Sequence, residues 1–165
     1  MTRGKIIDLF IDNAAKAAAE PVRISGGEEL NGVLARILAG SDLIFCPFVT
    51  EREKAIKLSP DKLTREYTAA SAFVEEVFAA VAETGSLVWT SQGGRPVQAG
   101  LVCTHHVAMV SEENIHETLD DFFSSLGDSP PTNVTLETGP SRTGDIELTL
   151  TIGVHGPSRL TVIVF

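Results

Sequence analysis

The chain is poor in cysteine and has no long apolar run. It contains Cys46 and Cys103 as its only cysteines among 165 residues. Two thiols cannot form a cysteine-rich iron–sulfur or zinc site by themselves, and nothing in the sequence suggests a disulfide, so reduced thiols are expected. The longest apolar runs, about four or five residues, are far too short to span a membrane. Asp8 and Asp12 interrupt any signal-peptide core. A cytoplasmic protein is predicted.

Basic residues are also scarce. Thirteen lysines and arginines stand against 22 acidic residues, which gives a net charge of −9. A protein this acidic lacks the electrostatic footprint for duplex nucleic acid, and anionic membrane surfaces are disfavoured for the same reason. The net charge does not exclude a local basic site that holds a small anionic ligand.

The residues that are present alternate between helical and extended patterns. The spacing of apolar residues predicts helices over 6–18, 28–38 and 73–81, and a further helix from Ser111 through 123. Short apolar runs predict strands at 22–24, 43–46, 87–89, 107–110, 134–136 and 160–165, while the polar stretch 49–68 is expected to be solvated helix and loop. This alternation favours one α/β domain, 1–165, with a mainly parallel sheet. Within it, 1–40 is an N-terminal helical part and 41–165 is the core.

Three polar, glycine-containing segments lie next to these strands, and the first runs from Ala82 to Ser86. Glu83 could be a general base or nucleophile, with Thr84, Gly85 and Ser86 beside it at the same turn. The alternative is a helix C-terminal cap in which Glu83 is simply solvated.

The second segment contains His105 and His106. Adjacent residues on an extended chain point to opposite faces, so the two rings cannot easily share one metal ion. One is left to face a site while the other packs or meets solvent, and a purely structural histidine is the alternative. His116 is interpreted as an exposed helix residue.

The third segment, 138–147, is the richest. Gly139 allows close backbone approach, and Ser141, Arg142 and Thr143 could hold a carboxylate or phosphate if a helical turn begins there. The alternative is a capped turn in which Arg142 pairs with Asp145 or Glu147. The alternation over 146–152 is instead typical of a strand, and the sequence alone does not decide between the two.

A tight loop with His155 and Gly156 precedes the last strand. His105, Asp145 and His155 would supply a metal-binding set, but their spacing does not bring them together, and no metal site is predicted. Since no phosphate-loop or dinucleotide motif is present, no cofactor is predicted, and any cofactor would belong to a partner.

Four of these pieces resemble the LUD domain family, the family of the LutC (YkgG) lactate-utilisation proteins. They are 82–86, 104–106, 138–147 and 153–157, in the family's order, and the resemblance is strong over the C-terminal half of the chain. It implies a three-layer α/β/α fold of the NagB/RpiA/CoA-transferase-like kind, and a turn or loop after Ser141. It also implies a role beside two iron–sulfur partner proteins in the oxidation of L-lactate to pyruvate, and this chain's two cysteines are consistent with the absence of a cluster.

Together these observations predict a LutC-like accessory protein or subunit whose cleft holds a small carboxylate or phosphate. Arg142, Ser141 and Thr143 would bind the anion, and Asp145 would orient Arg142 or a histidine. Glu83 and His155 are the candidate catalytic residues, and the other expected ligand-binding residues are Thr84, Gly85, Ser86, His105, Gly139 and Gly156. Two alternatives remain open: a freestanding transferase or isomerase that uses Glu83, and a non-catalytic docking partner of iron–sulfur subunits. No stand-alone catalytic motif establishes an enzyme.

Overall fold

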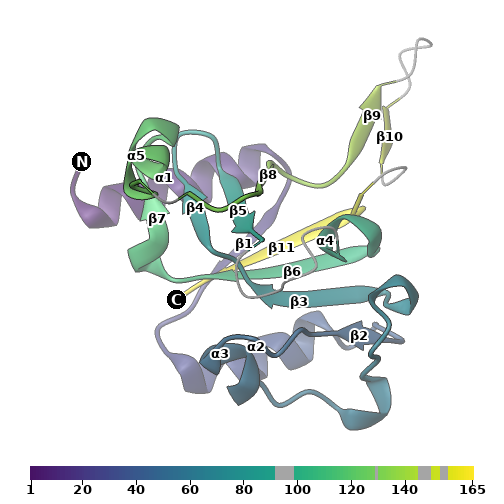
Figure 1. Ribbon diagram of the computed structural model, residues 1–165. Helices are drawn as coiled ribbons and strands as arrows, with labels where there is room; N and C mark the ends of the chain where they lie inside the picture. Colours follow the sequence, from purple (N-terminus) through teal and green to yellow (C-terminus); the bar gives the residue numbers. More distant parts are fainter. Residues whose placement is uncertain (92–98, 129, 145–149, 153–155) are drawn as a thin grey trace.

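A parallel five-stranded sheet forms the centre of the molecule (Figure 1). The computed structural model describes residues 1–91, 99–128, 130–144, 150–152 and 156–165. The strand order is β1-β11-β6-β3-β2, and every pairing in this sheet is parallel. The strands are β1 (Glu20–Arg23), β2 (Ile44–Phe45), β3 (Ala72–Glu76), β6 (His105–Val110) and β11 (Arg159–Val164).

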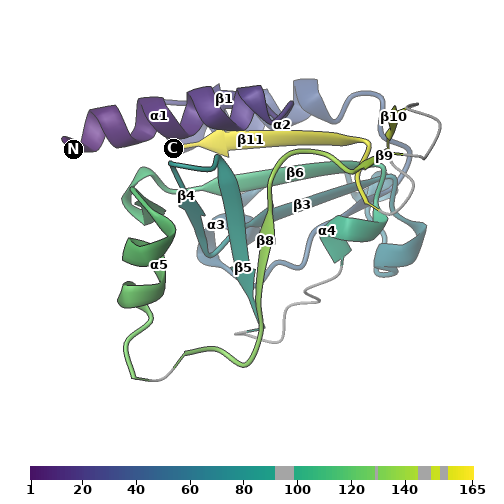
Figure 2. The same cartoon turned by 90° about the horizontal axis from the view of Figure 1, so that it is seen from above.

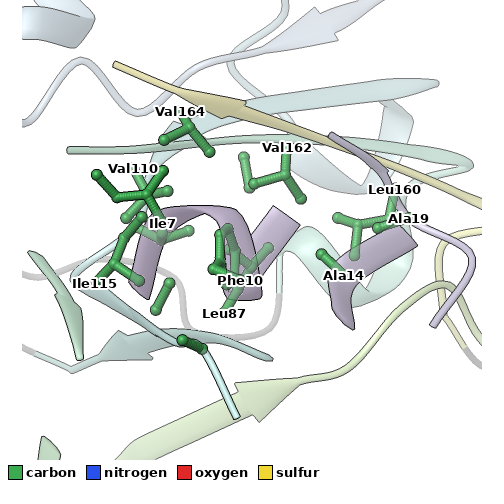
Figure 3. Close-up of a cluster of buried hydrophobic side chains, with 14 of the residues drawn as sticks. Ile7, Phe10, Ala14, Ala19, Leu87, Val110, Ile115, Leu160, Val162 and Val164 are labelled. Carbon is green, nitrogen blue, oxygen red and sulfur yellow. The ribbon is translucent and has the colours of Figure 1, made fainter. Parts of the chain in front are cut away.

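Helices cover both faces of this sheet, which confirms the predicted α/β fold with a mainly parallel central sheet. On one face, α1 (Arg3–Lys16) packs Ile7, Phe10 and Ala14 against apolar residues of β6 and β11 (Figure 3). On the other face, α2 (Gly27–Ile37) packs Leu30, Val33 and Leu34 against β2, β3, β6 and β11. Both helices follow the sequence pattern, because their apolar residues recur every three or four positions.

A second sheet lies beside α1, on the same face of the parallel sheet, and was not predicted (Figure 2). Its order is β7-β4-β5-β8, built from β4 (Ala79–Val81), β5 (Ser86–Thr90), β7 (Ile115–His116) and β8 (Val134–Glu137). The pairings β4–β5 and β5–β8 are antiparallel. α5 (Leu119–Ser125) covers the outer face through Phe122, which packs against Ala79, Val81 and Val88.

The helix predicted over 73–81 is wrong, because this stretch lies in β3 and β4 instead. Phe73, Val74 and Val81 are all fully buried, since both faces of the segment are covered. A strand that is buried on both faces loses the polar–apolar alternation that marks a half-exposed strand, and its apolar residues then fit a helical spacing by chance.

The remaining short elements lie in the connections between strands. They are α3 (Glu51–Ala55), α4 (Ala99–Val102) and the 3-10 turns η1 (Pro60–Lys62), η2 (Tyr67–Ala69) and η4 (Glu112–Asn114). In the stretch expected to be solvated, Glu53 is instead fully buried, and its carboxylate accepts hydrogen bonds from the backbone N–H groups of Val49, Thr50 and Glu76.

A two-stranded hairpin, β9 (Arg142–Gly144) with β10 (Leu150–Ile152), projects from the two sheets (Figure 1). The chain after Ser141 is therefore extended, and the helical turn or loop that the resemblance favoured over a strand is wrong for residues 142–144. The strand pattern at 150–152 is confirmed. Among the described helices, none is both long enough and apolar enough to cross a membrane.

Candidate functional site

The most unusual polar feature of the described structure is His106, which has no exposed surface. It is the second residue of β6 and lies in register with Phe73 on β3. The imidazole stacks on the Phe73 ring, with centroids 5.7 Å apart and planes 24° apart, and meets Trp89 edge-on at 5.5 Å. Two aromatic rings therefore fix the orientation of the imidazole.

Both nitrogens of this ring are hydrogen-bonded to carboxylates. Nε2 lies 3.0 Å from Oε1 of Glu75, and Nδ1 lies 2.9 Å from Oε2 of Glu137. Glu75 comes from β3, whereas Glu137 comes from β8 of the second sheet. The Glu75–His106–Glu137 cluster thus joins the two sheets through a buried polar core.

The two carboxylates decide the charge of His106. Burial of the ring would by itself lower its pKa, but the attraction of Glu137 and the hydrogen bonds to both carboxylates outweigh this effect and raise the pKa to about 10. At neutral pH the ring is therefore an imidazolium that donates both N–H groups. In that state it has no lone pair for a proton, so it cannot serve as a general base.

One oxygen of this cluster accepts no hydrogen bond from the part of the chain that the structure describes. Glu137 is 7% exposed, and its Oε1 is buried with no hydrogen-bond partner among the described residues. An unsatisfied buried acceptor costs about 1–3 kcal/mol, and more if it is charged. Such an atom in a native fold calls for a specific explanation, such as a bound group or a catalytic role.

Helix α4 closes one side of the cluster. A side chain at Gly100 would place its Cβ 2.9 Å from Cε1 of His106, so only glycine allows the helix to lie this close. The thiol of Cys103 donates a hydrogen bond to the Gly100 carbonyl at 3.3 Å. Burial, followed by the charge of Glu137, raises the pKa of this thiol to about 12, so Cys103 stays protonated and is not an activated nucleophile.

His105 points to the opposite face of the sheet from His106, as adjacency on an extended chain predicts. Its Nε2 lies 2.8 Å from the Thr161 hydroxyl. Burial, with a contribution from the charge of Arg159, lowers its pKa to about 4. The carboxylate of Glu20 forms an ion pair with Arg159 at 2.6 Å and also accepts a hydrogen bond from Thr161. His105 is therefore neutral at physiological pH and is separated from the cluster by the sheet itself.

The side chain of Glu83 is already engaged in the structure. Its carboxylate accepts a 2.6 Å hydrogen bond from the N–H of Leu119, the first residue of α5, and its own N–H donates to the Glu117 carbonyl. A carboxylate at this position stabilises a helix N-terminus. The structure does not bring Glu83 together with His106.

The neighbouring hydroxyls form a separate small group. The Ser86 hydroxyl donates to Thr84 at 2.7 Å and lies 2.6 Å from the hydroxyl of Thr138. Leu87, the next residue, is in register with Glu137. Because side chains alternate along a strand, Ser86 points to the face of the second sheet opposite the cluster.

The glycines of these motifs contact helix α1. A Cβ added at Gly85 (φ +67°) would lie only 2.3 Å from the backbone nitrogen of Ala14, and one added at Gly139 (φ +76°) only 2.0 Å from the Ala17 carbonyl. Both positions therefore need a positive φ and have no room for a side chain. Their observed role is to let two turns lie against the C-terminal half of α1.

Ser141 and Gly156 do come together. The N–H of Ser141 donates to the Pro157 carbonyl at 2.8 Å, and a Cβ at Gly156 would lie 2.9 Å from that of Ser141 and 3.9 Å from the Leu101 carbonyl of α4. Arg142 is exposed at the start of β9, followed by Thr143 on the same strand. Asp145 and His155 lie outside the described residues. The Ser141–Gly156 contact therefore lies beside α4, the helix that also abuts His106.

A surface depression of about 560 Å³ lies elsewhere, at the carboxyl end of β3. Its described lining includes Glu76, Phe78, Thr90 and His116 but no lysine or arginine, so it lacks a cation for an anionic ligand. His116 is a half-buried residue of β7 that contacts Phe122, which corrects its interpretation as an exposed helix residue. Burial lowers its pKa, so it adds no positive charge at neutral pH.

Sequence reasoning did not select any member of the Glu75–His106–Glu137 cluster as a site residue. Glu75 fell within the segment interpreted as a helix, and Glu137 was next to a predicted strand. The sequence did contain a signal: Glu75 directly follows the apolar residues 72–74, and His106 directly precedes the apolar residues 107–110. Unpaired charges are rarely buried, so each needed a partner.

With this geometry established, similarity to known proteins defines the class. Residues 49–165 match the LUD domain family. The fold matches the crystal structure of a DUF162 family protein from Deinococcus radiodurans, with a TM-score of 0.74 and 23% identity, over 99% of this chain and 98% of that chain. The α/β architecture with a parallel central sheet is thus shared with a solved structure.

This chain belongs to the LUD domain family. It is similar to Lactate utilization protein C of Deinococcus radiodurans, with 28% identity over 99% of this chain and 81% of that protein. It is also similar to Lactate utilization protein C of Halalkalibacterium halodurans, with 30% identity over 51% of this chain and 39% of that protein. The family and its LutC-like character agree with the resemblance found in the sequence.

Proposed function

We propose that this LUD-domain chain acts in the oxidation of L-lactate, or a closely related small 2-hydroxy acid, to the 2-keto acid. One observation carries the proposal: the similarity to a Lactate utilization protein C extends over 99% of the chain. The Glu75–His106–Glu137 cluster supports it, because a buried carboxylate held by an imidazolium can interact with the hydroxyl whose proton the oxidation removes.

The electrons released at C2 require an acceptor, and we assign that role to iron–sulfur partner proteins. Both cysteines of this chain are buried, and Cys103 is held protonated. Cluster ligands must be thiolates, and four are usual, so electron transfer is expected to occur on other chains. Within this proposal the chain is a cytoplasmic subunit, and residues 1–165 form one LUD domain.

The carboxylate of the acid is assigned to the Ser141–Arg142 region. Arg142 is an exposed guanidinium one residue from the Ser141–Gly156 contact, which lies against α4. A guanidinium can bind a carboxylate through two parallel hydrogen bonds. α4 also lies against His106, so the proposed carboxylate site and the cluster have this helix as a common neighbour.

Genetic complementation tests the function. Deletion of the gene in its own host should abolish growth on L-lactate as the carbon source but leave growth on pyruvate intact, and the wild-type gene should restore it. Normal growth of the deletion strain on L-lactate would refute the proposed function.

Arg142→Ala tests the carboxylate site. Because L-lactate and pyruvate share the carboxylate, the substitution should weaken the binding of both acids by a similar factor, about tenfold or more. Isothermal titration calorimetry measures this directly. Arg36→Ala is the matched control, because Arg36 is an exposed residue of α2 on the opposite face of the parallel sheet. This variant should bind both acids as the wild type does. Unchanged binding in Arg142→Ala would contradict the assignment.

A further inference from the structure

The unpaired oxygen of Glu137 has a defined chemical preference. His106 occupies Oε2 at 2.9 Å, which leaves Oε1 as the free oxygen of a carboxylate that is 93% buried, given its 7% exposure. An ionised carboxylate only accepts hydrogen bonds. A group placed against Oε1 must therefore carry a donor, and a carbonyl or a second carboxylate at that position would be repelled.

The surroundings hold this oxygen in place. The imidazolium of His106 fixes the carboxylate of Glu137 from one side, and Glu75 holds the other ring nitrogen at 3.0 Å. Stacking on Phe73 and the edge of Trp89 prevent the ring from turning. A preorganised acceptor discriminates between ligands more sharply than a mobile one, because it cannot relax away from a mismatched group.

The 2-hydroxy acid and 2-keto acid of the proposed reaction differ in this one property. L-lactate presents a hydroxyl at C2, which can donate a hydrogen bond, whereas pyruvate presents a carbonyl oxygen, which can only accept one. The carboxylate group is common to both. An acceptor-only oxygen placed at C2 would therefore distinguish the two acids.

We infer that Glu137 is the specificity-determining residue of this site, and that its Oε1 accepts the hydrogen bond of the C2 hydroxyl of a 2-hydroxy acid. His106 and Glu75 are positioning residues that act through Glu137. This inference rests on the proposed function for the choice of acid. It goes further by naming the atom that separates the reduced from the oxidised form.

The experiment measures preference rather than affinity alone. The chain is titrated calorimetrically with L-lactate, pyruvate and propionate, which lacks the oxygen at C2. The wild type should bind L-lactate about ten- to a hundredfold more tightly than either of the other acids, the range expected for a hydrogen bond to a charged group. In Glu137→Gln, whose amide can also donate, that preference should disappear, and pyruvate should bind at least as well as L-lactate.

Controls separate recognition from folding. Glu113→Gln, at an exposed glutamate of η4, should keep the wild-type preference. If Glu137→Gln does not fold, (S)-2-methoxypropionate provides the test on the wild type, because methylation removes the donor and keeps the C2 oxygen. The methoxy acid should bind the wild type no more tightly than pyruvate or propionate does.

Several outcomes overturn the inference: no binding of L-lactate to the wild type, equal binding of L-lactate and pyruvate, or an unchanged preference in folded Glu137→Gln. None of these refutes the proposed function if the deletion strain still fails to grow on L-lactate. Conversely, a preference for L-lactate that depends on Glu137 would support the role of Glu137. Normal growth of the deletion strain on L-lactate would, in that case, still refute the proposed function in L-lactate oxidation.

Discussion

The adjacent residues His105 and His106 lie on opposite faces of the sheet, and their pKa values are shifted in opposite directions. His106 meets two carboxylates and its pKa is raised to about 10, whereas His105 meets a hydroxyl and the neighbouring Arg159 and its pKa is lowered to about 4. Both rings are buried. Burial disfavours the charged form of each, so the partners, and not the depth, decide which ring is charged.

His105 should make the fold sensitive to mild acid. Its pKa lies below the ordinary value of 6.5, so the unfolded chain takes up a proton at this residue before the native chain does. Its contribution to the free energy of unfolding is complete above pH 6.5 and is lost as the pH falls toward about 4. Glu20 and Arg159 titrate outside most of this range, because their ion pair lowers the one pKa and raises the other.

His105→Gln measures that contribution. The amide of glutamine can still bond the Thr161 hydroxyl but does not titrate. Chemical denaturation of wild type and variant between pH 7 and pH 4 should show a steeper loss of stability in the wild type, and the two curves should converge as the pH falls. Parallel curves would show that His105 does not carry this pH dependence.

At the scale of elements, α1 depends on two glycine turns. Gly85 and Gly139 both lie at positive φ, and both would place a Cβ against the backbone of α1 or of the residue that follows it. The sequence analysis expected these glycines in ligand-binding turns, where a ligand would lie close to the backbone. In the structure the group close to the backbone of each turn is instead the C-terminal end of α1.

Gly139→Ala should be severely destabilising, by about 3 kcal/mol or more, because it combines an unfavourable φ with a contact of 2.0 Å to the Ala17 carbonyl. Gly127→Ala is the matched control. Gly127 has a similar φ of +61° but open space around its Cβ position, so only the conformational cost of about 1–2 kcal/mol should appear. Thermal unfolding of both variants tests this, and equal losses would contradict the contact with α1.

The sequence predicted the helices and strands that show a clear spacing of apolar residues within the element itself. The helices at α1 and α2 and the strands β5, β6, β8 and β11 lie where apolar spacing predicted them. The segment 73–81 was wrongly predicted to be a helix, because burial on both faces removed the alternation of polar and apolar residues. The second sheet could not be predicted, since it depends on pairings such as β5 with β8, which lie almost fifty residues apart in the chain.

In the candidate site, too, only the features that depend on neighbouring residues in the chain could be predicted. Adjacency alone predicted that His105 and His106 face opposite ways, but Glu75, His106 and Glu137 come from three strands of two sheets. No spacing along the chain brings these three together. Of the residues expected to bind a ligand or act in catalysis, Gly85 and Gly139 lie against α1 and the residue that follows it, and Glu83 caps α5.

The whole molecule is acidic, with a net charge of −9, and its proposed ligand is an anion. Long-range electrostatics therefore oppose binding, so recognition must come from local contacts. In the proposed site, Arg142 would supply an exposed positive charge for the carboxylate. The Glu75–His106–Glu137 cluster would supply a fixed acceptor for the hydroxyl, in a core that connects both sheets and α4.

The most direct test of this account is the nitrogen NMR spectrum of the His106 ring while L-lactate is added at about pH 8, between the ordinary histidine pKa and the raised one. The account predicts an imidazolium with both nitrogens protonated, whose signals shift and saturate with L-lactate but not with propionate. A neutral ring at this pH, or signals that ignore L-lactate, would contradict it.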